Sequence, residues 1–132
     1  MLIRVDPDSP RALYDQVAAS VRSDILAGVL APGDRLPAAR DVAEALDINQ
    51  HTVLHAYQQL RDEGLVDLRR GRGAVIAASA APLAELAHAI DDLVRRAAAL
   101  GVSAATLAGI VRAHRDTGTG TRPIEHSEED SP

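Results

Sequence analysis

Residues 32–77 read PGDRLPAARDVAEALDINQHTVLHAYQQLRDEGLVDLRRGRGAVIA, and the first part of this stretch predicts two short helices. Pro37 suits the first turn of a helix that runs through Leu46, because the first N–H groups of a helix have no partner within it. Asn49 then offers an oxygen that caps a second helix. The apolar residues of that second helix recur at helical spacing and predict its buried face: Val53, Ala56, Tyr57 and Leu60.

Residues 63–65, EGL, indicate a glycine C-cap that ends this second helix. The apolar spacing then changes to two residues. Val66 and Leu68 alternate with polar neighbours, which predicts a half-buried strand. Residues 70–73, RGRG, indicate a turn, and residues 74–77 indicate the return strand. The expected fold is therefore mainly α with a small β-hairpin.

A further helix is expected before this stretch. Its apolar residues recur every four positions: Leu13, Val17, Val21 and Ile25. Either Asp8 or Ser9 is expected to cap this helix, with Pro10 in its first turn. Gly28 is expected to end it.

The sequence after the hairpin predicts a pair of antiparallel helices. Residues 79–82 are expected to form a linker, Gly101 to end the first helix of the pair, and Ser103 to cap the second. Apolar residues of the first helix follow a heptad pattern: Leu83, Leu86, Ile90, Leu93, Ala97 and Leu100. This face is the expected dimerisation surface. The alternative is that it packs on its own second helix or on the preceding domain.

Two short helices joined by a tight turn indicate a helix-turn-helix when the second helix begins with polar side chains. The major groove of B-DNA is about 12 Å wide and admits one such helix, which contacts base edges from its first turns. The candidate DNA-binding residues here are Asn49, Gln50, His51, Thr52 and His55. Asn49 alone is also explained as a cap, and Thr52 as a packing residue. Leu54 either contacts a thymine methyl or packs, and packing is the favoured interpretation.

The turn of the hairpin holds a second cluster of candidate DNA-binding residues. Arg69, Arg70 and Arg72 lie within four residues of one another and alternate with Gly71 and Gly73. Arginines pair with phosphates or enter a minor groove, and glycines let the backbone approach closely. The alternative is a solvated hairpin tip whose charge only keeps the protein soluble.

The composition of the chain excludes several classes of protein. The 132 residues include no cysteine and no lysine, so a disulfide, a thiolate zinc site and a lysine Schiff base are impossible. No catalytic constellation is evident, and neither an enzyme activity nor a cofactor is expected. His51 and His55 have the i, i+4 spacing of metal ligands, but their helix favours DNA contact, and no metal site is expected.

The net charge of −5 is concentrated in residues 116–132, which contain five acidic residues and one arginine. This segment is expected to be a disordered acidic tail. Residues 35–73 hold six arginines and six acidic residues, which leaves room for local basic patches. No apolar run approaches the roughly 18 residues of a membrane span, and the N-terminus lacks a signal-peptide pattern. A cytoplasmic protein without a membrane partner is expected.

Residues 9–77 resemble the winged helix-turn-helix of the GntR family of bacterial transcription regulators. The matching motifs are PGDxLP at 32–37, NxxTV at 49–53, AY at 56–57, EGLV at 63–66 and RGxG at 70–73. The alanine–tyrosine pair and the short two-helix C-terminus resemble the YtrA-type subgroup. The resemblance implies a winged helix-turn-helix domain over residues 1–78 and a helical dimerisation region over residues 79–115.

The resemblance also implies roles for single residues. Arg40 matches an arginine that contacts a base or a phosphate, Arg35 is expected to reach a phosphate, and Arg70 with Gly71 matches a wing tip that enters the minor groove. The sequence departs from the family pattern at four positions. The family usually has serine, glycine, arginine and threonine where this chain has, respectively, Ala38, Asp47, Gln50 and Ala74. Glutamine fits adenine whereas arginine fits guanine, so an operator different from the usual family site is expected.

The leading hypothesis is a transcriptional regulator, expected to be a repressor, that binds a palindromic DNA operator as a homodimer. The alternative is a winged-helix adaptor that binds proteins and not a specific DNA sequence, which the net acidity favours and the three-arginine wing does not. The sequence identifies no small-molecule effector.

Overall fold

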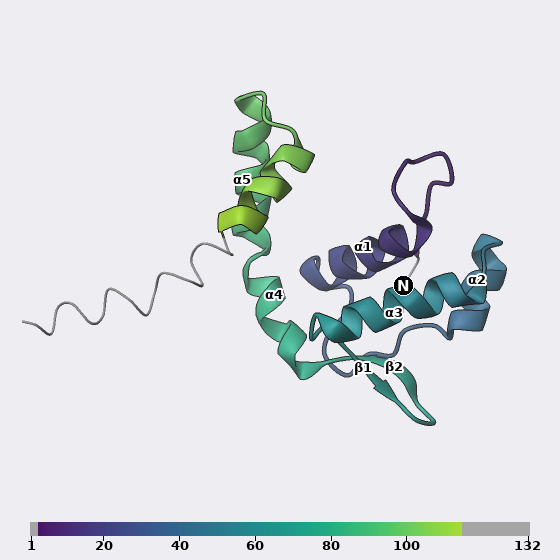
Figure 1. Ribbon diagram of the computed structural model, residues 1–132. Helices are drawn as coiled ribbons and strands as arrows, with labels where there is room; N and C mark the ends of the chain where they lie inside the picture. The colour runs from purple at the N-terminus through teal and green to yellow at the C-terminus, as the bar shows by residue number, and fades with distance from the viewer. Residues whose placement is uncertain (1–2, 115–132) are drawn as a thin grey trace, which may run out of the picture. The chain divides into compact units, whose positions relative to one another are not determined.

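The computed structural model describes residues 3–114 (Figure 1). In chain order its elements are α1 (Leu13–Leu26), α2 (Ala39–Leu46), α3 (Gln50–Asp62), β1 (Val66–Arg69), β2 (Gly73–Ile76), a 3-10 helix (Ala78–Ala80), α4 (Ala81–Glu85), α5 (Ala87–Ala99) and a helix over residues 104–114. The described part of the chain divides into two compact units, one up to residue 87 and the other from residue 88 onward. The predicted tail, residues 116–132, lies outside the described residues.

The mainly helical architecture with one small hairpin is confirmed. Among the helices of residues 3–114, none combines the length and the apolarity that a membrane span requires.

The core of the first unit is organised around α3. Figure 1 shows α3 between α1 and the hairpin, and both α1 and α2 pack against it. The largest fully buried side chains are all aliphatic: Leu60, Ile76, Val17, Val21, Val53 and Val66. The predicted buried face of α3 is confirmed, because its four residues are at most 3% exposed. Burial of each large aliphatic side chain stabilises the fold by about 1.5–3 kcal/mol, and this burial fixes the orientation of α3.

The start of α1 differs from the prediction. Ala12, not Asp8 or Ser9, is the N-cap residue, and it makes no side-chain capping bond. The buried side chain of Gln16 holds the preceding arm instead: its Nε2 donates to the carbonyls of Asp6 and Arg11, at 3.1 and 3.0 Å. The arm is therefore fixed by a residue inside the helix, which sequence spacing alone does not reveal.

Helix α2 begins at Ala39, two residues later than predicted, because Pro37 and Ala38 remain outside it. Ala38 is extended, with ψ 142°, and offers no side-chain cap, as expected from the missing serine. The helix ends at Asp47, which has φ +57° and ψ +49°. Aspartate tolerates this left-handed conformation better than most residues, so the turn forms without the usual glycine.

Both ends of α3 are confirmed as predicted. The Asn49 side chain accepts a hydrogen bond from the backbone N–H of His51 at 2.8 Å, which satisfies one free donor of the first turn. At the other end Gly64 has φ +82°, and the N–H of Leu65 donates to the carbonyl of Leu60 at 3.0 Å. This is the Schellman arrangement, which turns the chain directly into β1.

The hairpin pairs β1 and β2 in antiparallel register, with Val66 opposite Ile76 and Arg69 opposite Gly73. Val66 is buried, but Leu68 is 40% exposed, so the predicted inward alternation holds only for the first half of β1. Leu68 is not part of the hydrophobic core cluster, although Val66 is.

The segment before α2 forms a further edge of this sheet, which the sequence analysis missed. The N–H of Leu36 donates to the carbonyl of Ala74, and the N–H of Ile76 donates to the carbonyl of Asp34, both at 2.8 Å. Arg35 forms the bridge with Val75. Strand β2 is thus hydrogen-bonded on both edges, and Arg35 is fixed beside the hairpin.

Residues 79–82 are helical, so the predicted linker is wrong. Ser79 donates a hydrogen bond to the carbonyl of Gly64, and Ala80 is 1% exposed in the core. Leu83 also packs against that core. This first residue of the predicted dimerisation face is therefore half-buried within its own chain.

The predicted continuous helix from residue 83 to residue 100 is two helices, which meet at Leu86. The N–H of Leu86 donates to the carbonyl of Leu83, a tighter i−3 bond that closes α4 before α5 begins. The remaining residues of the predicted face differ in exposure: Leu86 is 52%, Ile90 37%, Leu93 45% and Leu100 81% exposed, whereas Ala97 is 7% exposed.

Residues 100–103 reverse the chain direction in the second unit (Figure 1). Gly101 has φ +82°, and the N–H of Val102 donates to the carbonyl of Ala97 at 2.8 Å. Ser103 then caps the helix over residues 104–114 by accepting from the N–H of Thr106 at 3.1 Å. The predicted helical hairpin is confirmed in its turn and its cap.

An ion pair ties α1 to the end of α3. Arg22 donates to both carboxylate oxygens of Glu63, at 2.9 and 2.6 Å. This hydrogen bonding lowers the pKa of Glu63 below its ordinary value. Because the pKa of Glu63 is lower in the folded state than in the unfolded state, the ion pair stabilises the fold at pH values above the unfolded-state pKa. This contribution disappears as the pH falls through the folded-state pKa.

We therefore expect the free energy of unfolding to fall between pH 6 and pH 3.5 less steeply in Glu63→Gln than in the wild type. Urea denaturation at both pH values measures the difference. Glu44→Gln is the control, because Glu44 is exposed and forms no ion pair with the residues that the structure describes. An equal pH dependence in wild type and Glu63→Gln would show that the pair contributes nothing.

Candidate nucleic-acid interface

A shallow hollow of about 600 Å³ lies between α2, α3 and the hairpin. Five arginines line it, and none of the described residues around it is acidic: the arginines are Arg35, Arg40, Arg69, Arg70 and Arg72. Its other walls come from α3 and from the segment that leads into α2, through residues such as Gln50, Leu54, Tyr57, Leu36 and Pro37. The protein as a whole is acidic, yet five of its 14 arginines line this one surface.

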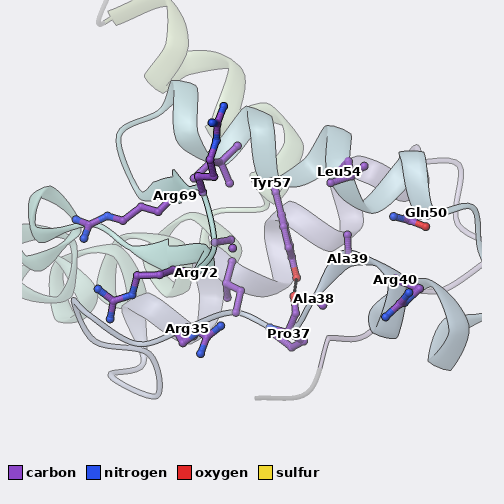
Figure 2. A pocket seen from close by; sticks show the side chains of 15 residues that line it. Arg35, Pro37, Ala38, Ala39, Arg40, Gln50, Leu54, Tyr57, Arg69 and Arg72 are labelled. Atoms are coloured by element: carbon purple, nitrogen blue, oxygen red, sulfur yellow. Dashed lines mark hydrogen bonds between the residues drawn. The ribbon is translucent and has the colours of Figure 1, made fainter.

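Three elements bring these arginines together. Arg40 is the second residue of α2, and Arg35 is held by its bridge to β2. Arg69, Arg70 and Arg72 surround the hairpin turn, where Gly71 has φ +81°, a conformation that favours glycine. Figure 2 shows Arg40 at one end of the hollow, with Arg35, Arg69 and Arg72 at the other.

Most of these guanidinium groups are available to a ligand. Arg69 forms an ion pair with Asp67 at 3.3 Å. The other four arginines of the hollow form no ion pair with any residue in the range 3–114. Guanidinium groups repel one another, so a cluster with four arginines that lack an acidic partner favours an anionic ligand with several charges.

A buried tyrosine fixes the floor of the hollow. The Tyr57 hydroxyl donates to the carbonyl of Pro37 at 2.7 Å, which ties the segment before α2 to α3 (Figure 2). Burial raises the pKa of this hydroxyl above its ordinary value, so it remains a donor throughout the physiological range. The sequence analysis assigned Tyr57 only to the core and missed this bond.

The polar residues at the start of α3 do not all face the same way. Gln50 and Leu54 line the arginine hollow, and Leu54 is 36% exposed, which contradicts the favoured interpretation that it packs. A second depression borders the opposite side of the helix start. It is lined by Asn49, His51, Thr52 and His55 together with Leu13 and Tyr14 of α1.

The second depression contains an aromatic stack that the sequence analysis missed. The rings of Tyr14 and His55 lie with centroids 4.0 Å apart and planes 22° apart. Tyr14 thereby supports the exposed side of α3 from α1. Only the tertiary arrangement brings these residues together, because they are 41 positions apart in the sequence.

The geometry suits a double-stranded nucleic acid. The start of an exposed helix can enter a groove about 12 Å wide, while arginines at both ends of the hollow beside it reach the flanking phosphates. Within the described residues, no group of three or more histidine or acidic side chains is placed to hold a metal ion.

Comparisons with known proteins agree with this geometry. The profile of bacterial regulatory proteins of the gntR family matches residues 13–76. The HTH-type transcriptional regulator Rv1152 of Mycobacterium tuberculosis is 36% identical over 101 residues, which cover 76% of this chain and 84% of that protein.

Two YtrA proteins are also similar. The HTH-type transcriptional repressor YtrA of Bacillus subtilis is 37% identical over 79 residues, 60% of this chain; the chain spans only 61% of that repressor. The solved structure of YtrA from Sulfolobus acidocaldarius, a GntR-family transcription factor, is 31% identical and superposes with a TM-score of 0.55. That superposition covers 75% of this chain and 99% of the other.

Proposed function

Because the chain belongs to the GntR family of bacterial regulatory proteins, we propose that it represses transcription by binding a palindromic operator as a homodimer. The family consists of DNA-binding transcription regulators, and the helix-turn-helix of this chain is of that kind. In the proposed complex α3 lies in the major groove and the arginine hairpin reaches the adjacent minor groove.

One observation carries the DNA-binding part of the proposal. Five arginines surround a hollow beside the start of α3, and none of the described residues in its lining is acidic. A protein-binding adaptor does not need such a cluster. Phosphates of a duplex supply the regularly spaced negative charges that it fits.

The apolar surface of α5 supports the homodimer. Ile90, Leu93 and Val94 are 37–45% exposed on this one helix. Exposed apolar side chains at heptad spacing favour helix association, and an isologous contact places two identical DNA-binding units about a two-fold axis. Such a dimer reads a palindrome whose half-sites lie about one helical turn, or a multiple of it, apart.

The name of the Bacillus subtilis relative supports repression, because that protein is called a transcriptional repressor. A dimer bound across a promoter blocks transcription by occupancy alone. Repression therefore requires nothing from this chain beyond tight operator binding.

Removal of single arginines from the hollow tests the proposal. We expect Arg40→Ala and Arg70→Ala each to weaken operator binding by roughly 1–3 kcal/mol without changing the fold. Mobility-shift titrations measure the affinity, and circular dichroism checks the fold. Arg61→Ala is the matched control, because Arg61 lies on α3 outside the hollow and pairs with Asp62 at 3.2 Å.

The same titrations at rising salt separate DNA binding from an adaptor function. Binding through phosphates must weaken steeply as salt rises, because it releases condensed counterions. The proposal would be contradicted if the wild type bound none of the genomic fragments, or if its binding did not weaken as salt rises. Equal affinities of wild type, Arg40→Ala and Arg70→Ala would show that these residues are not the contacts.

A further inference from the structure

The two sides of the start of α3 differ in chemistry. Gln50 and Leu54, one turn apart, line the arginine hollow (Figure 2). His51 and His55 line the depression beside α1. The arginines that position DNA therefore surround only the first pair. Side chains that read base edges are expected beside the groups that fix the phosphates.

Gln50 carries a free amide into this hollow. Its side chain is exposed and forms no hydrogen bond with the residues that the structure describes. Figure 2 shows it at the same end of the hollow as Arg40. An amide presents one donor and one acceptor in a plane, which matches N7 and the N6 amino group of adenine and does not match the two acceptors of guanine.

Leu54 complements Gln50 with an apolar contact. It is 36% exposed, while Leu60 on the same helix is 0% exposed, so core packing does not account for its side chain. In the major groove, the C5-methyl of thymine is the one apolar group on a base edge. Side chains at i and i+4 are about 5–6 Å apart, and bases rise about 3.4 Å per step, so the two contacts fall within two base pairs.

We infer that Gln50 and Leu54 together specify each half-site, by reading an adenine and a thymine that lie within two base pairs of each other. This inference rests on the proposed function and deepens it. His51 and His55 do not read these two bases, and the stack of His55 on Tyr14 keeps that side of the helix next to α1.

The experiment begins with half-sites selected from random DNA by the full wild-type chain. Affinities are then measured by fluorescence anisotropy for all four base pairs at each selected position. We expect a preference of about 5- to 150-fold for adenine at one position, which Gln50→Ala abolishes and Gln50→Arg converts into a preference for guanine. Arg61→Ala, outside the hollow, is the control and is expected to retain the preference, whereas His51→Ala tests whether the other side of the helix start reads this base.

The thymine contact is tested by removing only its methyl group. Replacing thymine by uracil within two base pairs of the adenine is expected to weaken wild-type binding several-fold and to leave Leu54→Ala unaffected. Leu54 is a surface residue, so its loss does not threaten the fold, and circular dichroism checks this for every variant.

The outcomes separate this inference from the proposed function. A palindromic selected site whose base preferences are unchanged in Gln50→Ala and Leu54→Ala overturns the inference while the proposed function stands. Loss of the preference in His51→Ala alone also overturns it. If the wild type selects no sequence at all, both fail.

Discussion

Aspartates in place of Ile90 and Leu93 are expected to convert the proposed dimer into monomers and to lower operator affinity at least about 10³-fold. Both side chains are exposed on α5, at 37% and 45%, in the apolar pattern that favours a partner helix. Two aspartates in each chain would bury four unpaired carboxylates in the dimer contact, and association cannot offset that cost.

The size of this effect follows from the symmetry of the complex. Specific DNA-binding proteins reach dissociation constants of about 10⁻⁸–10⁻¹¹ M, and a monomer on one half-site retains only about half of that free energy. Sedimentation velocity at micromolar concentration measures the oligomeric state, and an operator titration measures the affinity.

The control for this prediction adds the same charges on the opposite side of α5. His88 and Ala99 are exposed and lie about half a turn away from Ile90 and Leu93. His88→Asp with Ala99→Asp is expected to remain a dimer with nearly unchanged affinity. Wild-type protein that sediments as a monomer, or two double variants that behave alike, would contradict dimerisation through this face.

Leu60→Ala is expected to lower the free energy of unfolding by about 2–5 kcal/mol. Leu60 is 0% exposed in α3, and its carbonyl accepts the hydrogen bond from Leu65 that ends the helix. The substitution leaves a cavity at the centre of a core that contains no phenylalanine or tryptophan. Since domains of this size have a total stability of about 5–15 kcal/mol, α3 would lose much of its support.

The control removes the same atoms from the same helix. Leu54 is 36% exposed, so Leu54→Ala is expected to cost less than about 1 kcal/mol. Urea denaturation of both variants measures the difference. Equal losses of stability would mean that α3 is not anchored through its Leu60 side.

Local signals made most of the winged helix-turn-helix predictable. Asn49 caps α3 and Gly64 ends it, because capping depends on a few neighbouring residues. The buried face of α3 follows from helical spacing for the same reason. The family resemblance marked Asp47 as standing where glycine is usual, and this residue has φ +57°.

The features that sequence analysis missed depend on contacts between distant residues. Arg35 joins the sheet through Val75, 40 positions later, and no local pattern marks it as a strand residue. Gln16 replaces the expected cap of α1 by bonding back to the arm. Leu68 is 40% exposed, so alternation alone did not reveal which residues of β1 join the core.

The division of the recognition residues also depends on tertiary structure. Sequence spacing placed Gln50 and His51 together on one polar surface, but α1 and the hairpin border opposite sides of the helix start. The break at Leu86 is a similar case, because a heptad pattern records apolar spacing and not the continuity of a helix.

Tethered cleavage tests most directly whether α3 and the arginine hairpin contact the same duplex. The chain has no cysteine, so an iron chelate can be attached at one chosen site, Gln58→Cys on α3 or Arg72→Cys on the hairpin. We expect both labelled proteins to cut the operator at neighbouring nucleotides of the same half-site, with the cuts repeated symmetrically about the dyad. Cleavage from only one label, or from both at unrelated positions, would contradict joint binding by the helix and the hairpin.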